Sequence, residues 1–204
     1  METKLTGFYR IRTYNDTKMK KYLLLLSLII LVSAANAQVV SPAEFFGYEI
    51  GDRFTHHHRV VDYFTAVSDA SDQVKLMEYG KTNEGRPLML AFVSSAQNIS
   101  NLEEIRKNNL KRANVLEGDA SSNKGIVWLS YNVHGNESSS TEASIKTIYK
   151  LLTDGKFSKY LENTVVVIDP CINPDGRERY VHFFEQWQYS NYNTNPDAAE
   201  HNEP

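Results

Sequence analysis

Residues 128–155 read WLSYNVHGNESSSTEASIKTIYKLLTDG, which indicates a strand, a short polar loop and an amphipathic helix in succession. Ile126–Leu129 is a nearly continuous apolar run, as expected of a strand covered on both faces. Ser139 followed three residues later by Glu142 is typical of a capping box, and Asp154-Gly155 marks the expected helix end. The loop should therefore lie at the carboxyl edge of an α/β sheet, where ligands usually bind.

The polar loop contains His134 and Glu137, whose side chains are suited to binding zinc. Imidazole and carboxylate are common zinc ligands, and a catalytic zinc takes three protein ligands and keeps one position open. The spacing alone is weak evidence, because His182 and Glu185 repeat it on an expected helix whose apolar face lies on the other side. We interpret that second pair as solvated. For the first pair, a polar loop that caps a helix stays an alternative.

The N-terminal region has the pattern of a secretory signal peptide. Met19–Ala37 has a basic start, an apolar core and the small residues Ala35-Asn36-Ala37, which predicts cleavage before Gln38. The apolar run is short for a membrane span and is not followed by a cysteine, so we expect no stable membrane anchor. We expect an upstream segment and signal peptide at 1–37, with Met19 as the true start, and a single domain at 38–204. The protein should be exported to the periplasm or the extracellular space.

Charge and cysteine content limit the function classes. The segment 1–37 carries six Lys/Arg and two Asp/Glu, so the net charge of −3 divides into +4 there and −7 in the remainder. A mildly acidic domain without a basic run argues against nucleic acid as a partner. Cys171 is the single cysteine, which excludes an internal disulfide. Because it ends an apolar run, we interpret it as a small buried hydrophobe rather than a nucleophile.

The rest of the chain predicts further elements of an α/β domain. These are a helix capped by Thr55 that turns Val60, Val61, Phe64 and Val67 inward, strands at 74–81 and 87–94 joined by a turn at Asn83-Glu84-Gly85, a polar helix within 101–115, a linker at 118–124 and a strand at 163–170. The consecutive His56, His57 and His58 are expected to face solvent, because successive side chains on a helix point apart. The strands flanking the central helix should pair in parallel. This brings the tight turn expected at Asn173-Pro174-Asp175-Gly176 to the same sheet edge as His134.

Three groups of residues together make the chain resemble the zinc carboxypeptidases of the funnelin (M14) type. They are Gly80 with Glu84-Gly85-Arg86-Pro87-Leu88, then His134-Gly135-Asn136-Glu137, then Asn173-Pro174-Asp175-Gly176, in the order of that family. The resemblance covers roughly residues 42–190. It implies a three-layer α/β/α fold with a mixed, mostly parallel sheet. It also implies that His134 and Glu137 are two of three ligands to Zn²⁺.

The resemblance implies a function as well, the zinc-dependent release of C-terminal residues from peptides or proteins with a free C-terminus. In that family zinc polarises the scissile carbonyl and activates water, while a later glutamate is the general base and a later histidine completes the ligands. Neither has a counterpart in 38–204, so we assign no catalytic residue. The resemblance thus implies the N-terminal portion of a catalytic domain, incomplete at its C-terminus and inactive by itself. Arg177 and Arg179 match no family role, and we expect both to be solvated.

Two other functions stay open. An amide deacylase of the aspartoacylase or desuccinylase type shares the His-Gly-Asn-Glu loop, although the resemblance gives those proteins no Glu-Gly-Arg-Pro-Leu hairpin with Asn-Pro-Asp-Gly. A non-catalytic exported binding module is the second, because the general base is missing from the sequence.

Overall fold

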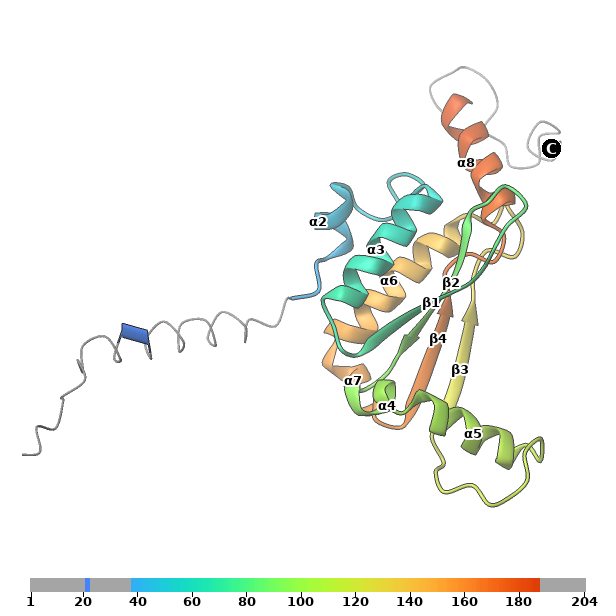
Figure 1. Cartoon of the computed structure of the whole chain (residues 1–204). Coiled ribbons are helices and arrows are strands. Elements are labelled where there is room, and N and C mark those ends of the chain that lie inside the picture. The colour runs from blue at the N-terminus through green and yellow to red at the C-terminus, as the bar shows by residue number, and fades with distance from the viewer. Residues whose placement is uncertain (1–20, 23–37, 188–204) are drawn as a thin grey trace, which may run out of the picture. The chain divides into compact units, whose positions relative to one another are not determined.

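The computed structural model describes residues 21–22 and 38–187, and all but the first two of these belong to a unit that spans Ala37–Pro204. The helices of this unit are α2 (Pro42–Phe46), α3 (His57–Asp69), α4 (Ala96–Ser100), α5 (Leu102–Arg112), α6 (Ser139–Thr153), α7 (Gly155–Leu161) and α8 (Pro174–Trp187) (Figure 1). The strands are β1 (Val74–Lys81), β2 (Pro87–Val93), β3 (Gly125–Ser130) and β4 (Thr164–Asp169).

The predicted signal peptide at 19–37 lies outside the described residues, apart from Lys21 and Tyr22. Within the described residues, no helix is both long enough and apolar enough to cross a membrane.

In the described part of the chain, four strands form one mixed sheet in the order β1-β2-β4-β3. β1 and β2 form the predicted hairpin, and β2 pairs antiparallel with β4. β3 and β4 pair in parallel, with Gly125 opposite Thr164 and Ser130 opposite Asp169. This confirms the pairing predicted for two strands joined through helices. The chain therefore has the predicted α/β fold with a mixed sheet, although of the three described strand pairs two are antiparallel and one is parallel.

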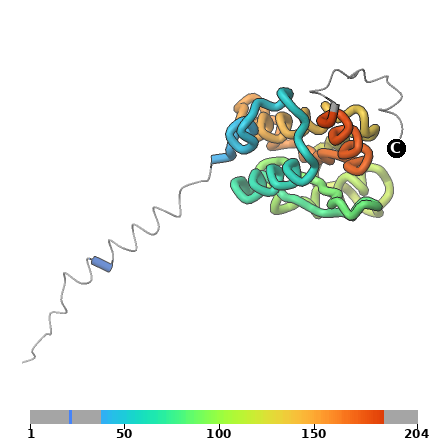
Figure 2. The backbone as a smooth tube through the Cα atoms, turned by 90° about the horizontal axis from the view of Figure 1, so that it is seen from above, coloured from blue at the N-terminus to red at the C-terminus, as the bar shows by residue number. Residues whose placement is uncertain are grey.

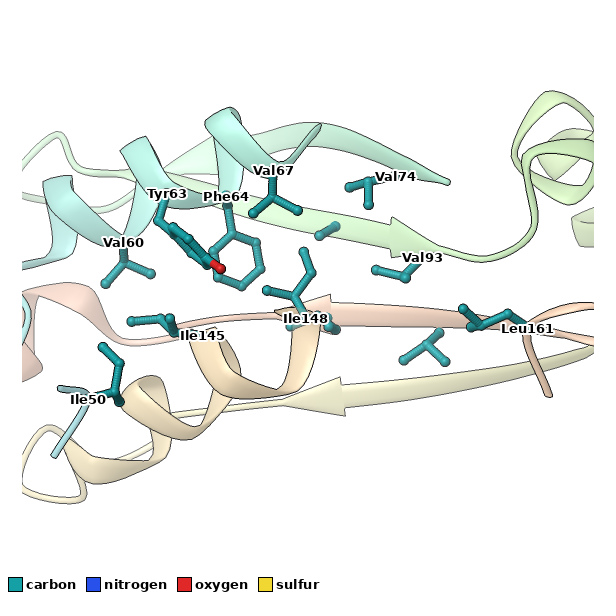
Figure 3. Close-up of a cluster of buried hydrophobic side chains, with 13 residues drawn as sticks. Ile50, Val60, Tyr63, Phe64, Val67, Val74, Val93, Ile145, Ile148 and Leu161 are labelled. Atoms are coloured by element: carbon teal, nitrogen blue, oxygen red, sulfur yellow. The ribbon is translucent and has the colours of Figure 1, made fainter. Parts of the chain in front are cut away.

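The main core lies between the sheet and the helices α3 and α6 (Figure 3). Phe64 and Val67 of α3 are buried as predicted and belong to one cluster with Ile145 and Ile148 of α6. Full burial of such a side chain is worth about 1.5–3 kcal/mol. This cluster therefore fixes α6, and with it the loop that precedes α6, against the sheet.

β4 is an inner strand of the described sheet and is covered on both faces, as predicted. Val166 and Ile168 belong to the main core, whereas Val165 and Val167 pack in a second cluster with Ile105 of α5. Alternate residues of a strand point to opposite faces, so helices cover both sides of β4. At the end of β4 the chain enters α8, which lies beside the segment between α2 and α3 (Figure 2).

β3 is a strand as predicted, but the expectation that it is covered on both faces is wrong. Ile126, Val127 and Trp128 are 40%, 45% and 57% exposed. β3 lies at the edge of the described sheet, next to β4, and an edge strand has a neighbour on one side only. The apolar run of β3 correctly predicts a strand, but it does not show whether the described residues cover both faces of that strand.

Candidate active site

The loop that carries His134 and Glu137 connects β3 to α6 and is anchored by Asn132. The Asn132 side chain is 2% exposed, and its backbone has a φ of 56°. Asparagine tolerates this left-handed region better than most residues. Asn132 Nδ2 donates to the carbonyl of His134 at 2.8 Å, and its Oδ1 accepts from Thr141 Oγ1 of α6 at 3.1 Å. These two hydrogen bonds of Asn132 hold the loop in one conformation and attach it to the first turn of α6.

The two predicted ligands lie together and face solvent. Nδ1 of His134 is 3.2 Å from Oε2 of Glu137, and the side chains are 72% and 61% exposed. Tetrahedral zinc ligands at bond lengths of ~2.1 Å are ~3.4 Å apart. The pair can therefore reach one ion with the backbone as it stands, and an imidazole with a carboxylate suits zinc chemically.

Residues 174–176 form the start of α8, preceded by Asn173, rather than the predicted tight turn. Pro174 is the first residue of the helix, and Asn173 Oδ1 accepts from the amide of Gly176 at 3.0 Å. Asparagine is a favourable cap, and proline at the first helical position leaves no amide unpaired. The predicted position is nevertheless confirmed, because Asn173 Nδ2 donates to the carbonyl of Val133 at 3.3 Å. The start of α8 thus adjoins the metal-ligand loop.

Asp175 connects the β1–β2 hairpin to this edge of the sheet. Its Oδ1 accepts from Thr82 Oγ1 at 2.7 Å and from Arg86 Nη1 at 2.6 Å, while Oδ2 accepts from the amide of Glu84 at 3.2 Å. Burial raises the pKa of Asp175, but these donors outweigh burial and leave the pKa below its ordinary value. The predicted hairpin turn is confirmed, with the amide of Gly85 donating to the carbonyl of Thr82 at 3.0 Å. The β1–β2 hairpin therefore contacts the start of α8, which in turn contacts the His134 loop, so the three motifs of the sequence lie together.

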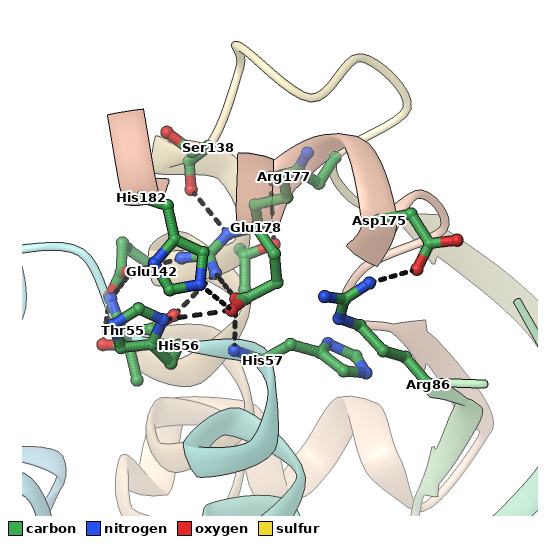
Figure 4. Close-up of polar contacts among 12 residues, drawn as sticks. Thr55, His56, His57, Arg86, Ser138, Glu142, Asp175, Arg177, Glu178 and His182 are labelled. Atoms are coloured by element: carbon green, nitrogen blue, oxygen red, sulfur yellow. Dashed lines mark hydrogen bonds and ion pairs between the residues drawn. The ribbon is translucent and has the colours of Figure 1, made fainter. Parts of the chain in front are cut away.

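Behind the loop lies a buried ion pair that sequence reasoning missed. Arg177 is fully buried, and it donates to Glu142 Oε1 at 2.7 Å and to the carbonyl of Thr55 at 2.6 Å (Figure 4). Glu142 also accepts from the amide of Thr55 at 2.6 Å and from its hydroxyl at 2.8 Å. The predicted capping box of Ser139 with Glu142 and the predicted cap of α3 by Thr55 are both wrong. Glu142 and Thr55 bond to each other, and the residues that precede the two helices, Ser138 and His56, make no side-chain cap bond. The expectation that Arg177 is solvated is therefore wrong. Arg179 is 59% exposed and pairs with Glu84 at 2.7 Å.

The three histidines at the start of α3 lie in different environments. His57 is 3% exposed, so the expectation that it faces solvent is wrong. Its Nε2 donates to the carbonyl of Pro87 at 2.9 Å, and burial lowers its pKa. His56 is partly buried and contacts α8, and only His58 is exposed as expected.

His182 and Glu185 do not form the solvated pair that we predicted, although both side chains are exposed. Nε2 of His182 lies 3.9 Å from Oε2 of Glu178, and Oε2 of Glu185 lies 3.2 Å from Nε2 of His56. Glu178 is itself 6% exposed. Burial raises its pKa, but hydrogen bonds from the His57 amide and from His56 outweigh burial and lower it overall.

Cys171 is 1% exposed, which confirms its interpretation as a buried residue, and burial raises the pKa of its thiol to about 11. At pH 8 only ~0.1% of such a thiol is ionised, against roughly a quarter for a cysteine of ordinary pKa. We expect the folded chain to react with an aromatic disulfide reagent at least ~100-fold more slowly than the urea-unfolded chain. The rate should rise about tenfold per pH unit. Equal rates for the two states at pH 8 would contradict this.

Comparison with known proteins identifies the family of the chain. The family model for zinc carboxypeptidases matches residues 60–201. Carboxypeptidase 2 of Trichophyton tonsurans is 28% identical over 118 residues, which cover 57% of this chain and 18% of that protein. A probable carboxypeptidase 2 of Arthroderma benhamiae is 32% identical over 89 residues, 43% of this chain and 16% of that protein.

The same fold occurs in carboxypeptidase A from Helicoverpa armigera. The two structures superpose with a TM-score of 0.50 at 20% identity, over 80% of this chain and 33% of the other. The chain thus spans less than a fifth of the curated relatives and a third of the solved one. Since the family model matches well over half of the chain, the chain belongs to the zinc carboxypeptidase family.

Proposed function

We propose that this chain is the N-terminal portion of a zinc-dependent metallocarboxypeptidase that releases C-terminal residues from peptides or proteins. The observation that carries the proposal is the pairing of His134 and Glu137 at 3.2 Å, beside the start of α8, in a chain of this family. His134 Nδ1 and Glu137 Oε2 would hold Zn²⁺. When bound, that ion would polarise a carbonyl and activate water.

The surrounding residues have positioning roles in this proposal. Asn132 donates a hydrogen bond to the carbonyl of His134 and so fixes the backbone from which the imidazole projects. The amide of Glu137 donates to the same carbonyl at 3.1 Å, which keeps the two ligands on one tight turn. Such outer contacts raise metal affinity because the ligands lose little freedom on binding.

The third ligand and the general base are proposed to lie in a later part of the family's domain. The family resemblance implies them there, and the exposed β3 offers an edge beside which later strands of such a domain would pair. We therefore propose that the 204-residue chain alone binds zinc weakly at His134 and Glu137 and hydrolyses no peptide, because two ligands hold zinc less firmly than three. We further propose export after cleavage before Gln38.

The test compares the 204-residue chain with a longer chain that carries the later strands. The longer chain should hydrolyse a peptide with a free C-terminus and lose this activity on chelation. His134→Ala should reduce hydrolysis to background, because a ligand is removed. His58→Ala is the matched control, since it removes an exposed histidine from α3 and should leave the rate unchanged.

Three outcomes would overturn parts of the proposal. Retained hydrolysis in His134→Ala would show that the ligand is wrong. Turnover of N-acylated amino acids with no turnover of peptides would favour the deacylase. Neither activity in the longer, zinc-loaded chain would favour a binding module.

A further inference from the structure

A second group of metal-ligating side chains lies where α8 meets the start of α3. His56 precedes α3, whereas Glu178 and His182 lie one turn apart on α8. One ligand atom from each of the three lies within 4.8 Å of the others. Figure 4 shows the two imidazole rings and the Glu178 carboxylate converging from the two elements. None of these residues belongs to the proposed His134–Glu137 site.

The distances are close to those of a tetrahedral metal site. Oε2 of Glu178 lies 3.0 Å from Nδ1 of His56 and 3.9 Å from Nε2 of His182. Ligands around a tetrahedral zinc are ~3.4 Å apart, so the two distances lie on either side of the required value. His182 is 62% exposed, and its ring already lies beside that of His56, with the ring centroids 5.1 Å apart.

The carboxylate of Glu178 is held in place by groups that are not ligands. Oε1 accepts from the amide of His57 at 2.7 Å and lies 3.6 Å from Nη1 of the buried Arg177. These contacts occupy Oε1 and leave Oε2 directed at the two imidazoles. A carboxylate fixed in this way is preorganised for a metal, since little of its freedom is lost on binding.

His56 is oriented as a ligand by a second carboxylate. Its Nε2 lies 3.2 Å from Oε2 of Glu185, which can accept the Nε2 proton. In the metal-free chain Nδ1 donates its proton to Oε2 of Glu178 at 3.0 Å. A metal would displace that proton to solvent and bind the Nδ1 lone pair, while Nε2 keeps its own proton for Glu185. Metal-bound histidines usually donate their other nitrogen to a carboxylate in this way.

We propose that His56 Nδ1, Glu178 Oε2 and His182 Nε2 bind a divalent transition-metal ion such as Zn²⁺, with Glu185 orienting His56 and one position open to water. Such an ion would tie the start of α3 to α8 and stabilise the fold. The inference goes beyond the proposed function and does not depend on it.

The test is a zinc chloride titration of the metal-free 204-residue chain, followed by calorimetry. Wild type should bind one zinc more tightly than a second. His182→Ala should weaken the tighter binding by at least ~10-fold, since even loss of an outer contact costs 10–100-fold. His58→Ala is the matched control, because His58 stacks on His56 with ring centroids 5.9 Å apart but lies outside the group. It should leave both affinities unchanged, and His134→Ala should change only the weaker one.

Thermal unfolding of the purified variants gives a second readout. Zinc should raise the Tm of wild type and of His58→Ala and should leave the Tm of His182→Ala nearly unchanged, because a ligand stabilises only the state that it binds. Equal zinc affinity and equal Tm shift in wild type and His182→Ala would overturn the inference. Loss of the tighter zinc in His134→Ala would overturn it as well, in favour of the first site alone. Loss in His182→Ala with no effect in His134→Ala would support the inference and count against the proposed function.

Discussion

Replacing Arg177 with methionine is expected to lower the free energy of unfolding by about 3–5 kcal/mol. Methionine is apolar and removes the charge and the donors. Glu142, which is 6% exposed, would lose the guanidinium that pairs with it at 2.7 Å in the interior. The carbonyl of Thr55 would lose its donor at 2.6 Å. Breaking a buried ion pair from one side is costly because the remaining charge stays out of water. Urea unfolding of the purified chain measures the change.

Arg179→Met is the matched control for this prediction. Arg179 lies on the same helix and has its own acidic partner, Glu84 at 2.7 Å, but it is 59% exposed. Exposed pairs are worth about 0–1 kcal/mol, so this variant should unfold nearly like wild type. Combining Arg177→Met with Glu142→Gln should cost less than the sum of the two single changes, because glutamine leaves no buried charge behind. Equal losses for the two arginines, or strict additivity with Glu142→Gln, would contradict the importance of burial.

The sequence predicted the elements that depend on local pattern. The patterns of 74–81 and 87–94 with the turn between them predicted the hairpin, and the continuous apolar run at 163–170 predicted the buried strand β4. The parallel pairing of β3 and β4 followed from the helix between them, and so did the meeting of the His134 loop with residues 173–176 at one edge. These features depend on the spacing of apolar residues and on the number of residues between two strands, and both can be read directly from the sequence.

The misjudged residues are those whose partners are distant in sequence. Glu142 lies 35 positions before Arg177 and 87 after Thr55, and local spacing made it the partner of Ser139 instead. One signal was available, because Glu142 lies three residues before the buried Ile145 and therefore on the apolar side of α6. A charged residue on a core-facing stripe indicates a buried partner. No comparable signal joined His56 to Glu178, since their contact depends on the packing of α8.

Gly135→Ala is expected to disrupt the junction between the His134 loop and α8. A Cβ at Gly135 would lie 2.4 Å from the carbonyl C and O of Gly176 and 2.9 Å from its Cα. These are backbone atoms, which cannot rotate away as a side chain can, so the loop and the start of α8 must separate. Overpacking of this kind costs about 1–3 kcal/mol, which urea unfolding should detect. The weaker zinc affinity proposed for His134 and Glu137 should fall as well, because the loop that positions them is displaced.

Gly155→Ala is the matched control, since an added Cβ there meets nothing within 4 Å at the first position of α7. Alanine in an unstrained position restricts the unfolded chain and should change stability by less than about 1 kcal/mol, in the stabilising direction. Wild-type stability in Gly135→Ala would show that the loop and α8 can separate at no cost. A loss of stability with unchanged zinc binding would show that the contact between Gly135 and Gly176 holds the fold together but does not set the position of His134. The expected result, loss of both in Gly135→Ala and of neither in Gly155→Ala, would make this contact the structural reason for a glycine directly after the histidine.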